Sequence, residues 1–147
     1  MILVIKNYKE NMMQNDLYNI GQAAIASGIS AKMIRRYEEI GLIPKASRTF
    51  SDYRVYNDKN LNMLRFIKHA RDLGFSGKQI SSLLNLWTDQ ARLSSEVKLL
   101  ATEHIQLLDQ KLKELNAMKS ELTRLVSCCH GDERPDCPIL DNLAQDK

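Results

Sequence analysis

The sequence predicts a mainly α-helical protein, with two short helices near the N-terminus and one long helix in the C-terminal half. Two observations lead to this prediction. Between Val97 and Val126 the chain contains neither Gly nor Pro, and apolar residues recur there every seven positions. Before that stretch, two short helical patterns meet at Gly28, which is the arrangement of a helix-turn-helix.

Composition points to a folded protein that meets a polyanion. Of the 147 residues, 27% are charged and 44% are apolar, as in ordinary soluble proteins of one or two small domains. Residues 1–80 carry 13 Lys/Arg and 7 Asp/Glu, a net charge of +6, whereas residues 81–147 carry 8 and 11, a net charge of −3. A basic front half beside an acidic rear half suggests a nucleic-acid partner for the front half.

The N-terminus predicts neither export nor membrane anchoring. Met1–Ile5 is too short for a signal-peptide core, and no apolar run approaches the length of a membrane span. We therefore expect a cytoplasmic protein with no membrane partner, whose three cysteines are reduced thiols suited to metal binding or reactivity. Residues 1–17 show little pattern and are expected to be a disordered leader.

Residues 18–56 are expected to form a DNA-binding domain. A first helix ends at Gly28, Ser30 caps a second helix over residues 31–40, and Gly41 ends it. Basic residues share one face of this second helix, where groove contacts are made in helix-turn-helix proteins; they are Lys32, Arg35 and Arg36. Met33, Ile34 and Tyr37 are expected on its packing face.

The segment from Pro44 to Tyr56 predicts a two-stranded wing. It is rich in turn-forming residues and ends in an alternating pattern at Tyr53 and Val55. Arg48, Tyr53 and Arg54 are suited to phosphate contacts, which set affinity and register rather than sequence choice.

Residues 57–93 predict two further helices. Asn57 is expected to cap a helix over residues 58–73, and Ser76 a helix over residues 77–87 with Trp87 facing inward.

Residues 94–127 are then expected to form the long helix, capped by Ser94 or Ser95. Its heptad positions are apolar, namely Ala101, Leu108, Leu115 and Leu122. No other predicted helix is long enough to cover that stripe, so we interpret it as a dimerisation helix. A long core helix of a monomeric bundle is the alternative.

The tail, residues 128–147, carries a thiol cluster. Cys129 and Cys137 bound a seven-residue loop, and two thiolates on such a loop suit Cu(I), Zn(II) or Fe–S iron. A four-ligand zinc site can be written with Cys128 and His130 added. An Fe–S cluster would need four cysteines and the chain has three, and the CxxC spacing of redox dithiols is absent. Two-coordinate binding of a soft monovalent ion needs only the two sulfurs.

These residues resemble the MerR family of transcriptional activators, and within it the copper-responsive CueR/HmrR group. The resemblance runs from Tyr18 to Leu143. It rests in front on IGQAA at 20–24, IRRYEEIGLI at 34–43, Arg48 and YRVY at 53–56, and behind on CHGDERPDCPIL at 129–140.

The resemblance implies a winged helix-turn-helix domain, a connecting helical pair and an antiparallel coiled-coil homodimer. Cys129 and Cys137 match the family's metal thiolates. Ser94 matches a position where sensors of divalent metals carry a third cysteine and copper sensors carry Ser, close to the metal loop of the partner protomer. The family's DNA-contacting positions match Lys32, Arg35, Tyr37, Arg48, Tyr53 and Arg54.

By the same resemblance the protein is not an enzyme but a Cu(I)-responsive activator that also binds Ag(I) and Au(I). It would bind promoter DNA in which the spacer between the −35 and −10 elements is too long. Once metal is bound, it would distort the duplex so that RNA polymerase engages both elements. The genes switched on would serve copper efflux or detoxification.

Other interpretations stay open. The protein could sense a divalent ion such as Zn(II) or Cd(II), with Cys128 or His130 as extra ligands. It could instead be a thiol redox enzyme or sensor, with Cys129 and Cys137 as the redox couple. A structural coiled-coil adaptor is a further alternative, but it would not explain the tail. Departures from the family pattern are the extra Cys128, Asp52 in place of the usual wing-turn Gly, and Arg36 in place of an aromatic. Gly21 at the start of the first helix predicts fraying there.

Overall fold

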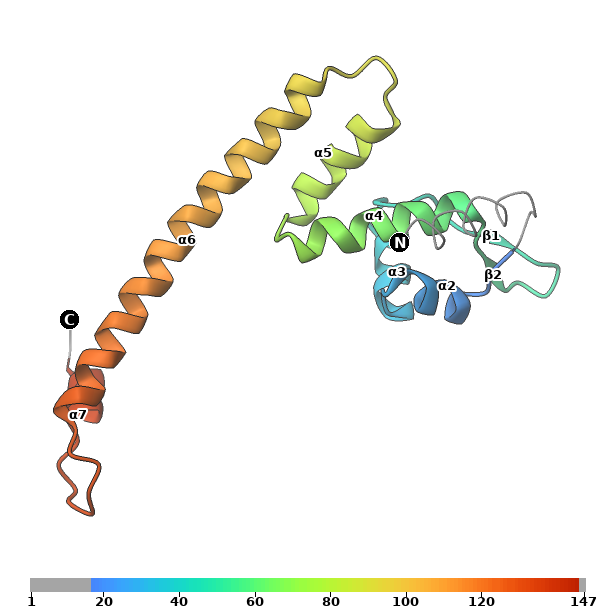
Figure 1. Cartoon of the computed structure of the whole chain (residues 1–147). Coiled ribbons are helices and arrows are strands. Elements are labelled where there is room, and N and C mark those ends of the chain that lie inside the picture. The colour runs from blue at the N-terminus through green and yellow to red at the C-terminus, as the bar shows by residue number, and fades with distance from the viewer. Residues whose placement is uncertain (1–16, 146–147) are drawn as a thin grey trace, which may run out of the picture. The chain divides into compact units, whose positions relative to one another are not determined.

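The computed structural model describes residues 17–145, which fall into two compact units, one ending at Arg92 and one beginning at Leu93. Helices α2 to α5 and both strands belong to the first unit, and helices α6 and α7 to the second (Figure 1). The leader predicted over residues 1–17 lies, except for Leu17, outside the described residues.

The helix-turn-helix is formed by α2 (Ile20–Ser27) and α3 (Ala31–Glu39), close to the predicted bounds. Gly28, with φ +74°, makes the left-handed turn between them. The Ser30 side chain accepts a hydrogen bond from the Met33 amide, which confirms the predicted cap. The fraying expected at Gly21 stays a prediction, and the structure argues against it, because Asn19 precedes α2 and forms a reciprocal capping box with Gln22.

The wing consists of two short antiparallel strands, β1 (Ser47–Arg48) and β2 (Arg54–Val55). Asp52 in the connecting turn has φ +64°, a left-handed conformation that favours Gly and that Asp tolerates. An isolated bridge pairs Tyr18 with Tyr56 through two hydrogen bonds of 2.8 Å. The wing is therefore joined at its base to the chain segment that leads into α2.

Helices α4 (Asp58–Asp72) and α5 (Gly77–Thr88) follow, with the predicted caps Asn57 and Ser76 in place. The core of this unit is built from apolar side chains of α2 to α5 and the connecting segments: Ala23, Ile29, Ile34, Tyr37, Ile43, Tyr56, Leu61, Leu64, Ile67, Ala70, Ile80 and Leu84. These burials hold α3 and the wing against one shared core.

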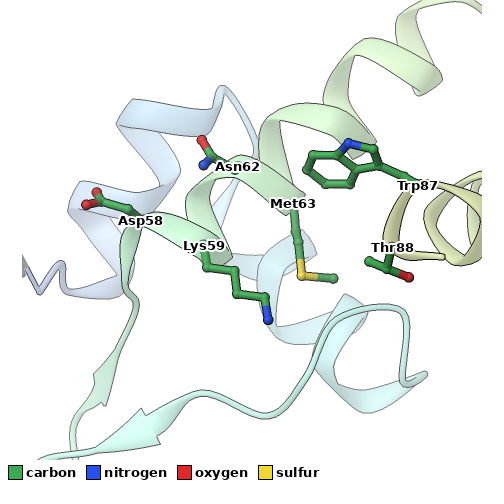
Figure 2. Close-up of a pocket in the computed structure, with 6 residues that line it drawn as sticks. All are labelled: Asp58, Lys59, Asn62, Met63, Trp87 and Thr88. Carbon is green, nitrogen blue, oxygen red and sulfur yellow. The ribbon is translucent and has the colours of Figure 1, made fainter. Parts of the chain in front are cut away.

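Trp87 does not face inward as predicted. Its ring stacks on Phe66 with centroids 4.7 Å apart and remains 42% exposed. It borders a pocket of about 370 Å³ between α4 and α5, whose lining also includes Asp58, Lys59, Asn62, Met63 and Thr88 (Figure 2).

The second unit is a single long helix, α6 (Ser94–Cys128), with the short α7 (Pro138–Ala144) packed near its C-terminal end (Figure 1). The predicted cap at Ser94 or Ser95 is wrong, since Ser94 is already the first helical residue and Leu93 precedes it. Leu125 is buried, but most of the apolar stripe is exposed: Ile105, Leu108, Leu112, Leu115, Met118 and Leu122.

Among residues 17–145, no helix has the length and apolar content needed to cross a membrane.

Candidate nucleic-acid interface and metal centre

The outer face of α3 carries the predicted basic residues. Lys32, Arg35 and Arg36 are exposed, while Ile34 and Glu38 are buried on the opposite side. Arg36 lies 3.5 Å from Glu39 in an exposed pair, a contact of little energetic weight. The face thus presents cationic side chains that a negatively charged groove can contact.

Tyr37 lies in the core rather than on this face. Its side chain is buried, as the packing prediction required, and its hydroxyl accepts a 2.8 Å hydrogen bond from Arg71 Nη1 of α4. The DNA contact that the resemblance implied for Tyr37 stays a prediction, and this burial argues against it. In the structure, Tyr37 links the back of α3 to α4.

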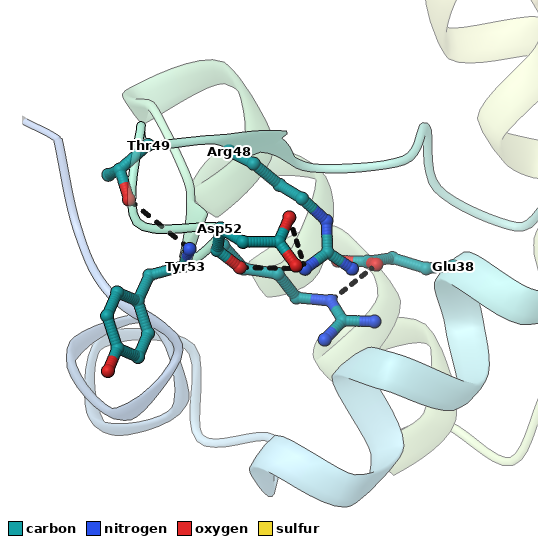
Figure 3. Close-up of polar contacts among 6 residues, drawn as sticks. Glu38, Arg48, Thr49, Asp52 and Tyr53 are labelled. Atoms are coloured by element: carbon teal, nitrogen blue, oxygen red, sulfur yellow. Dashed lines mark hydrogen bonds and ion pairs between the residues drawn. The ribbon is translucent and has the colours of Figure 1, made fainter.

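The wing holds its predicted phosphate-contacting residues in defined positions (Figure 3). Arg48 Nη1 donates to the Asp52 carbonyl at 2.9 Å and lies 3.4 Å from its carboxylate. The Tyr53 amide donates to the Thr49 hydroxyl at 3.2 Å, and the Tyr53 ring is largely exposed. Side chains that reach solvent from a backbone held this way can contact a DNA backbone.

Arg54 is held differently, by a buried carboxylate that sequence reasoning missed. Arg54 Nε donates to Glu38 Oε2 at 3.0 Å, and the Tyr56 hydroxyl donates to Glu38 Oε1 at 2.5 Å. The Glu38 hydrogen bond, followed by its charge, raises the pKa of Arg54; burial first, and then Glu38, raises the pKa of Tyr56. The available signal was the position of Glu38, which follows Ile34 by four residues and so shares its buried face.

The three cysteines are all free thiols. Cys129 immediately follows α6, Cys137 immediately precedes α7, and both are partly buried, whereas Cys128 is exposed. Two thiols of this kind fit a soft metal ion. Within residues 17–145, no group of three or more His, Cys, Asp and Glu side chains is arranged to hold a metal, so the four-ligand set is not assembled there.

The loop between these cysteines has its own local contacts. Gly131 adopts φ +64°, and Arg134 binds Asp132 through its side chain at 2.7 Å and its amide at 3.0 Å. Arg134 lowers the pKa of the Asp132 carboxyl through these hydrogen bonds. The acidic side chain nearest in sequence to Cys129 is thus engaged within the loop.

Ser94 lies far from the thiols of its own chain. It is exposed at the start of α6, and Cys129 follows the end of the same 35-residue helix. At 1.5 Å rise per residue, these positions are about 50 Å apart. A site that includes both Ser94 and Cys129 therefore needs two chains.

Comparison with known families matches two regions of the chain. Residues 19–56 match the model described as MerR family regulatory protein, and residues 61–125 match the model described as MerR, DNA binding. These regions contain the helix-turn-helix, the wing, α5 and most of α4 and α6.

Individual relatives cover most of the chain. An HTH-type transcriptional regulator HmrR of Sinorhizobium medicae (strain WSM419) is 54% identical over 127 residues, 86% of each chain. An HTH-type transcriptional regulator CueR of Escherichia coli O6:H1 is 37% identical over 126 residues, 86% of this chain and 93% of the relative.

Solved structures share the architecture. The transcription regulator PbrR691 from Ralstonia metallidurans CH34 in complex with lead(II) aligns with a TM-score of 0.72 and 32% identity, covering 85% of this chain and 98% of that one. MerR from Bacillus megaterium MB1 in complex with mercury(II) gives a TM-score of 0.62 and 25% identity, covering 84% and 96%. The chain therefore belongs to the MerR family of DNA-binding transcriptional regulators, and it is a regulator rather than an enzyme.

Proposed function

We propose that this protein is a cytoplasmic, copper(I)-responsive activator that binds promoter DNA as a homodimer. The observation that carries the proposal is the pair of partly buried free thiols, Cys129 and Cys137, at the two ends of one short loop. A relative named heavy metal-dependent transcription regulator 2, from Rhizobium meliloti (strain 1021), is 53% identical and supports a metal as the signal.

The small number of ligands in the proposed site favours a monovalent ion. Two thiolates and Cu(I) leave one net negative charge and satisfy a two-coordinate ion, and Ag(I) and Au(I) share this preference. With a divalent ion the site would be electrically neutral, but the ion would still need further ligands, because zinc usually binds four. Ser94 offers only a weak hydroxyl ligand, which would disfavour such an ion.

An antiparallel dimer would bring Ser94 to the metal loop. Because the two positions are about 50 Å apart along one α6, a partner helix running in the opposite direction places its own Ser94 near Cys129. The exposed stripe on α6 supports this pairing, because Leu108, Leu112 and Leu115 would otherwise remain in water.

The proposed output is a change of DNA shape. Lys32 and Arg35 would enter the groove, while Arg48, Tyr53 and Arg54 would contact backbone phosphates. We propose that the metal-loaded dimer distorts an overlong promoter spacer so that RNA polymerase engages both promoter elements, and that the genes controlled serve copper efflux or detoxification.

A competition titration tests the metal assignment. The reduced protein is titrated without oxygen, with Cu(I) and with Zn(II), each against a chelator of known affinity. We expect one tightly held Cu(I) per chain and weak Zn(II), with Cu(I) binding lost in Cys129→Ser and in Cys137→Ser.

Cys128→Ser is the matched control, because it removes the adjacent, exposed thiol. It should keep Cu(I) affinity within about threefold, since losing a non-ligand costs well under 1 kcal/mol. Normal Cu(I) binding in either of the other two serine variants would remove the assignment of the site.

A sensor of a divalent metal is the second candidate. Cys128 next to Cys129 and the relatives solved with lead(II) and mercury(II) favour it. The same titration separates the two, because tight Zn(II) or Cd(II) binding that is lost in Cys128→Ser, or with His130 replaced, would replace the copper proposal. Absence of any tight metal would favour a thiol redox sensor that uses Cys129 and Cys137.

A further inference from the structure

Glu38 places a carboxylate inside the DNA-binding unit, directly behind the wing. The residue lies in the last turn of α3 and is 8% exposed. A carboxylate at such depth is costly unless it is hydrogen-bonded and paired. Its two partners, Arg54 and Tyr56, are 16 and 18 residues away in sequence, so the contact joins the C-terminal end of α3 to β2.

Arg54 binds Glu38 through its Nε, so both terminal nitrogens of the guanidinium stay available for a phosphate. Arginine has five N–H donors, and Nε supplies only one of them. The four remaining donors sit on the two terminal nitrogens, whose fork matches two oxygens of a phosphate. Because Arg54 keeps 30% of its side chain exposed, this group lies at the boundary between the protein and solvent.

Two arginines lie opposite each other on the wing. Arg48 pairs with Arg54 in the β1–β2 register, and like charges in directly opposed positions repel. Each has its own carboxylate, with Asp52 3.4 Å from Arg48 and Glu38 3.0 Å from Arg54. These contacts hold both cations in place despite their repulsion.

The two arginines border a small depression between the end of α3 and the wing. Its volume is about 260 Å³, and it is lined by Glu38, Glu39, Lys45, Ala46, Arg48 and Arg54. Three cations line it, against two carboxylates; that of Glu38 is occupied by two hydrogen bonds, and that of Glu39 pairs with Arg36. The arrangement suits a DNA backbone phosphate.

We propose that Glu38 is a positioning residue for DNA binding, which holds Arg54 by its Nε so that the terminal nitrogens meet a backbone phosphate. This inference rests on the proposed phosphate contact of Arg54. Without the carboxylate, a long flexible side chain must be ordered at the moment of binding, and that ordering opposes association. The consequence has an unusual sign: removing this negative charge weakens binding to a polyanion.

The test uses the full chain and a mixed-sequence DNA duplex, because phosphate contacts do not depend on base sequence. Affinity is measured across a range of salt concentrations for the wild type, Glu38→Gln and Glu39→Gln. Both variants lose one negative charge at the same depression, but Glu39 is exposed and forms its ion pair with the exposed Arg36. We expect Glu38→Gln to bind about fivefold more weakly and Glu39→Gln to bind as well as the wild type or better.

A double-mutant cycle with Arg54→Ala separates positioning from general stability. Arg54→Ala should weaken binding and flatten the salt slope by about one. In the Arg54→Ala background, Glu38→Gln should cause no further loss. Arg54→Lys, which keeps the charge but lacks the fork, should weaken binding about as much as Glu38→Gln and serves if the latter fails to fold.

Three outcomes would overturn the inference. Equal losses from Glu38→Gln with and without Arg54 would make Glu38 merely structural. If Glu38→Gln or Arg54→Lys binds DNA with the affinity of the wild type, then positioning of Arg54 does not contribute to binding. If the wild type shows no salt-dependent binding to the duplex, the proposed DNA-binding function fails as well, whereas the first two outcomes leave it standing.

Discussion

Ser94 and Cys129 illustrate how single residues set the chemistry proposed here. Ser94 begins α6 with an exposed hydroxyl, and Cys129 follows the last residue of the same helix. Neither residue suffices to select a metal. The proposed selectivity arises because Ser94 carries a hydroxyl and not a thiolate. A hydroxyl is a poor ligand for soft ions, whereas a thiolate is a good one.

Replacing Ser94 by Cys should therefore widen the metal response. A third thiolate would give a divalent ion a more complete set of ligands, so we expect Zn(II) or Cd(II) affinity to rise at least tenfold, about 1.4 kcal/mol. Chelator competition measures this change. Ser94→Ala is the control, which should leave Zn(II) affinity low; an unchanged Zn(II) affinity in Ser94→Cys would contradict the selectivity argument.

Tyr56 predicts a pH dependence of stability. Burial and the hydrogen bond to Glu38 raise the pKa of Tyr56 in the folded protein above its ordinary value of about 10. The folded state then holds the phenol proton more tightly than the unfolded state does. Its contribution is fully present below about pH 10 and is lost as the pH rises from there through the folded-state pKa.

Urea unfolding at several pH values between 8 and 11 measures this effect. We expect the free energy of unfolding of the wild type to fall more steeply above pH 10 than that of Tyr56→Phe, which cannot ionise. Tyr53→Phe is the control, because the Tyr53 ring is largely exposed. Parallel pH profiles for the wild type and Tyr56→Phe would contradict the prediction.

At the scale of elements, the ends of the short helices are set by local hydrogen bonds. Asn19, Ser30, Asn57 and Ser76 each accept a bond from the backbone amide three residues further on. Three of these ends are reciprocal capping boxes. Such bonds use only neighbouring residues, which is why sequence reasoning located three of the four.

Asn19→Ala tests the cap of α2 that sequence reasoning missed. Removing the side-chain acceptor should lower the free energy of unfolding by about 1 kcal/mol. Chemical denaturation measures the loss, and Asn19→Ser, which retains an acceptor, should restore most of it. A loss no greater than for the exposed control Lys78→Ala would show that Gly21 already frays this end.

At the scale of the whole molecule, the apolar stripe of the long helix α6 is largely exposed within the described residues 17–145. Seven of its large apolar side chains, from Ile105 to Leu122, are more than one-third exposed. In a coiled coil such residues fill the holes of the opposing helix. The seven-residue repeat thus predicts an assembly that one chain cannot form.

Leu112→Asp and Leu115→Asp should dissociate the proposed homodimer. A charge at a buried seam position costs several kcal/mol, and two protomers would double that cost. Sedimentation measures the mass, and affinity for a two-half-site operator should fall in parallel. Lys113→Asp, on the polar side of α6, is the control; dimers that persist in both leucine variants would place the interface elsewhere.

The sequence predicted much of the fold because the signals are local. Gly28, Ser30 and Gly41 set the bounds of α3 within one residue, and the wing followed from turn-forming residues before Tyr53 and Val55. Errors arose where a neighbouring element decides. Trp87 fits an inward helical face, yet Phe66 covers only part of its ring.

By itself the sequence determined the basic face of α3, the wing, the length of α6 and the paired thiols, because periodicity, caps and spacing act over a few residues. Only the tertiary structure decided that Tyr37 meets Arg71, and that Glu38 holds Arg54 and Tyr56. These partners lie 16 to 34 residues apart. Contacts between neighbouring residues cannot bring these partners together. The shared core of α2 to α5 does so, because the burial of its apolar surface packs α3 against α4 and the wing.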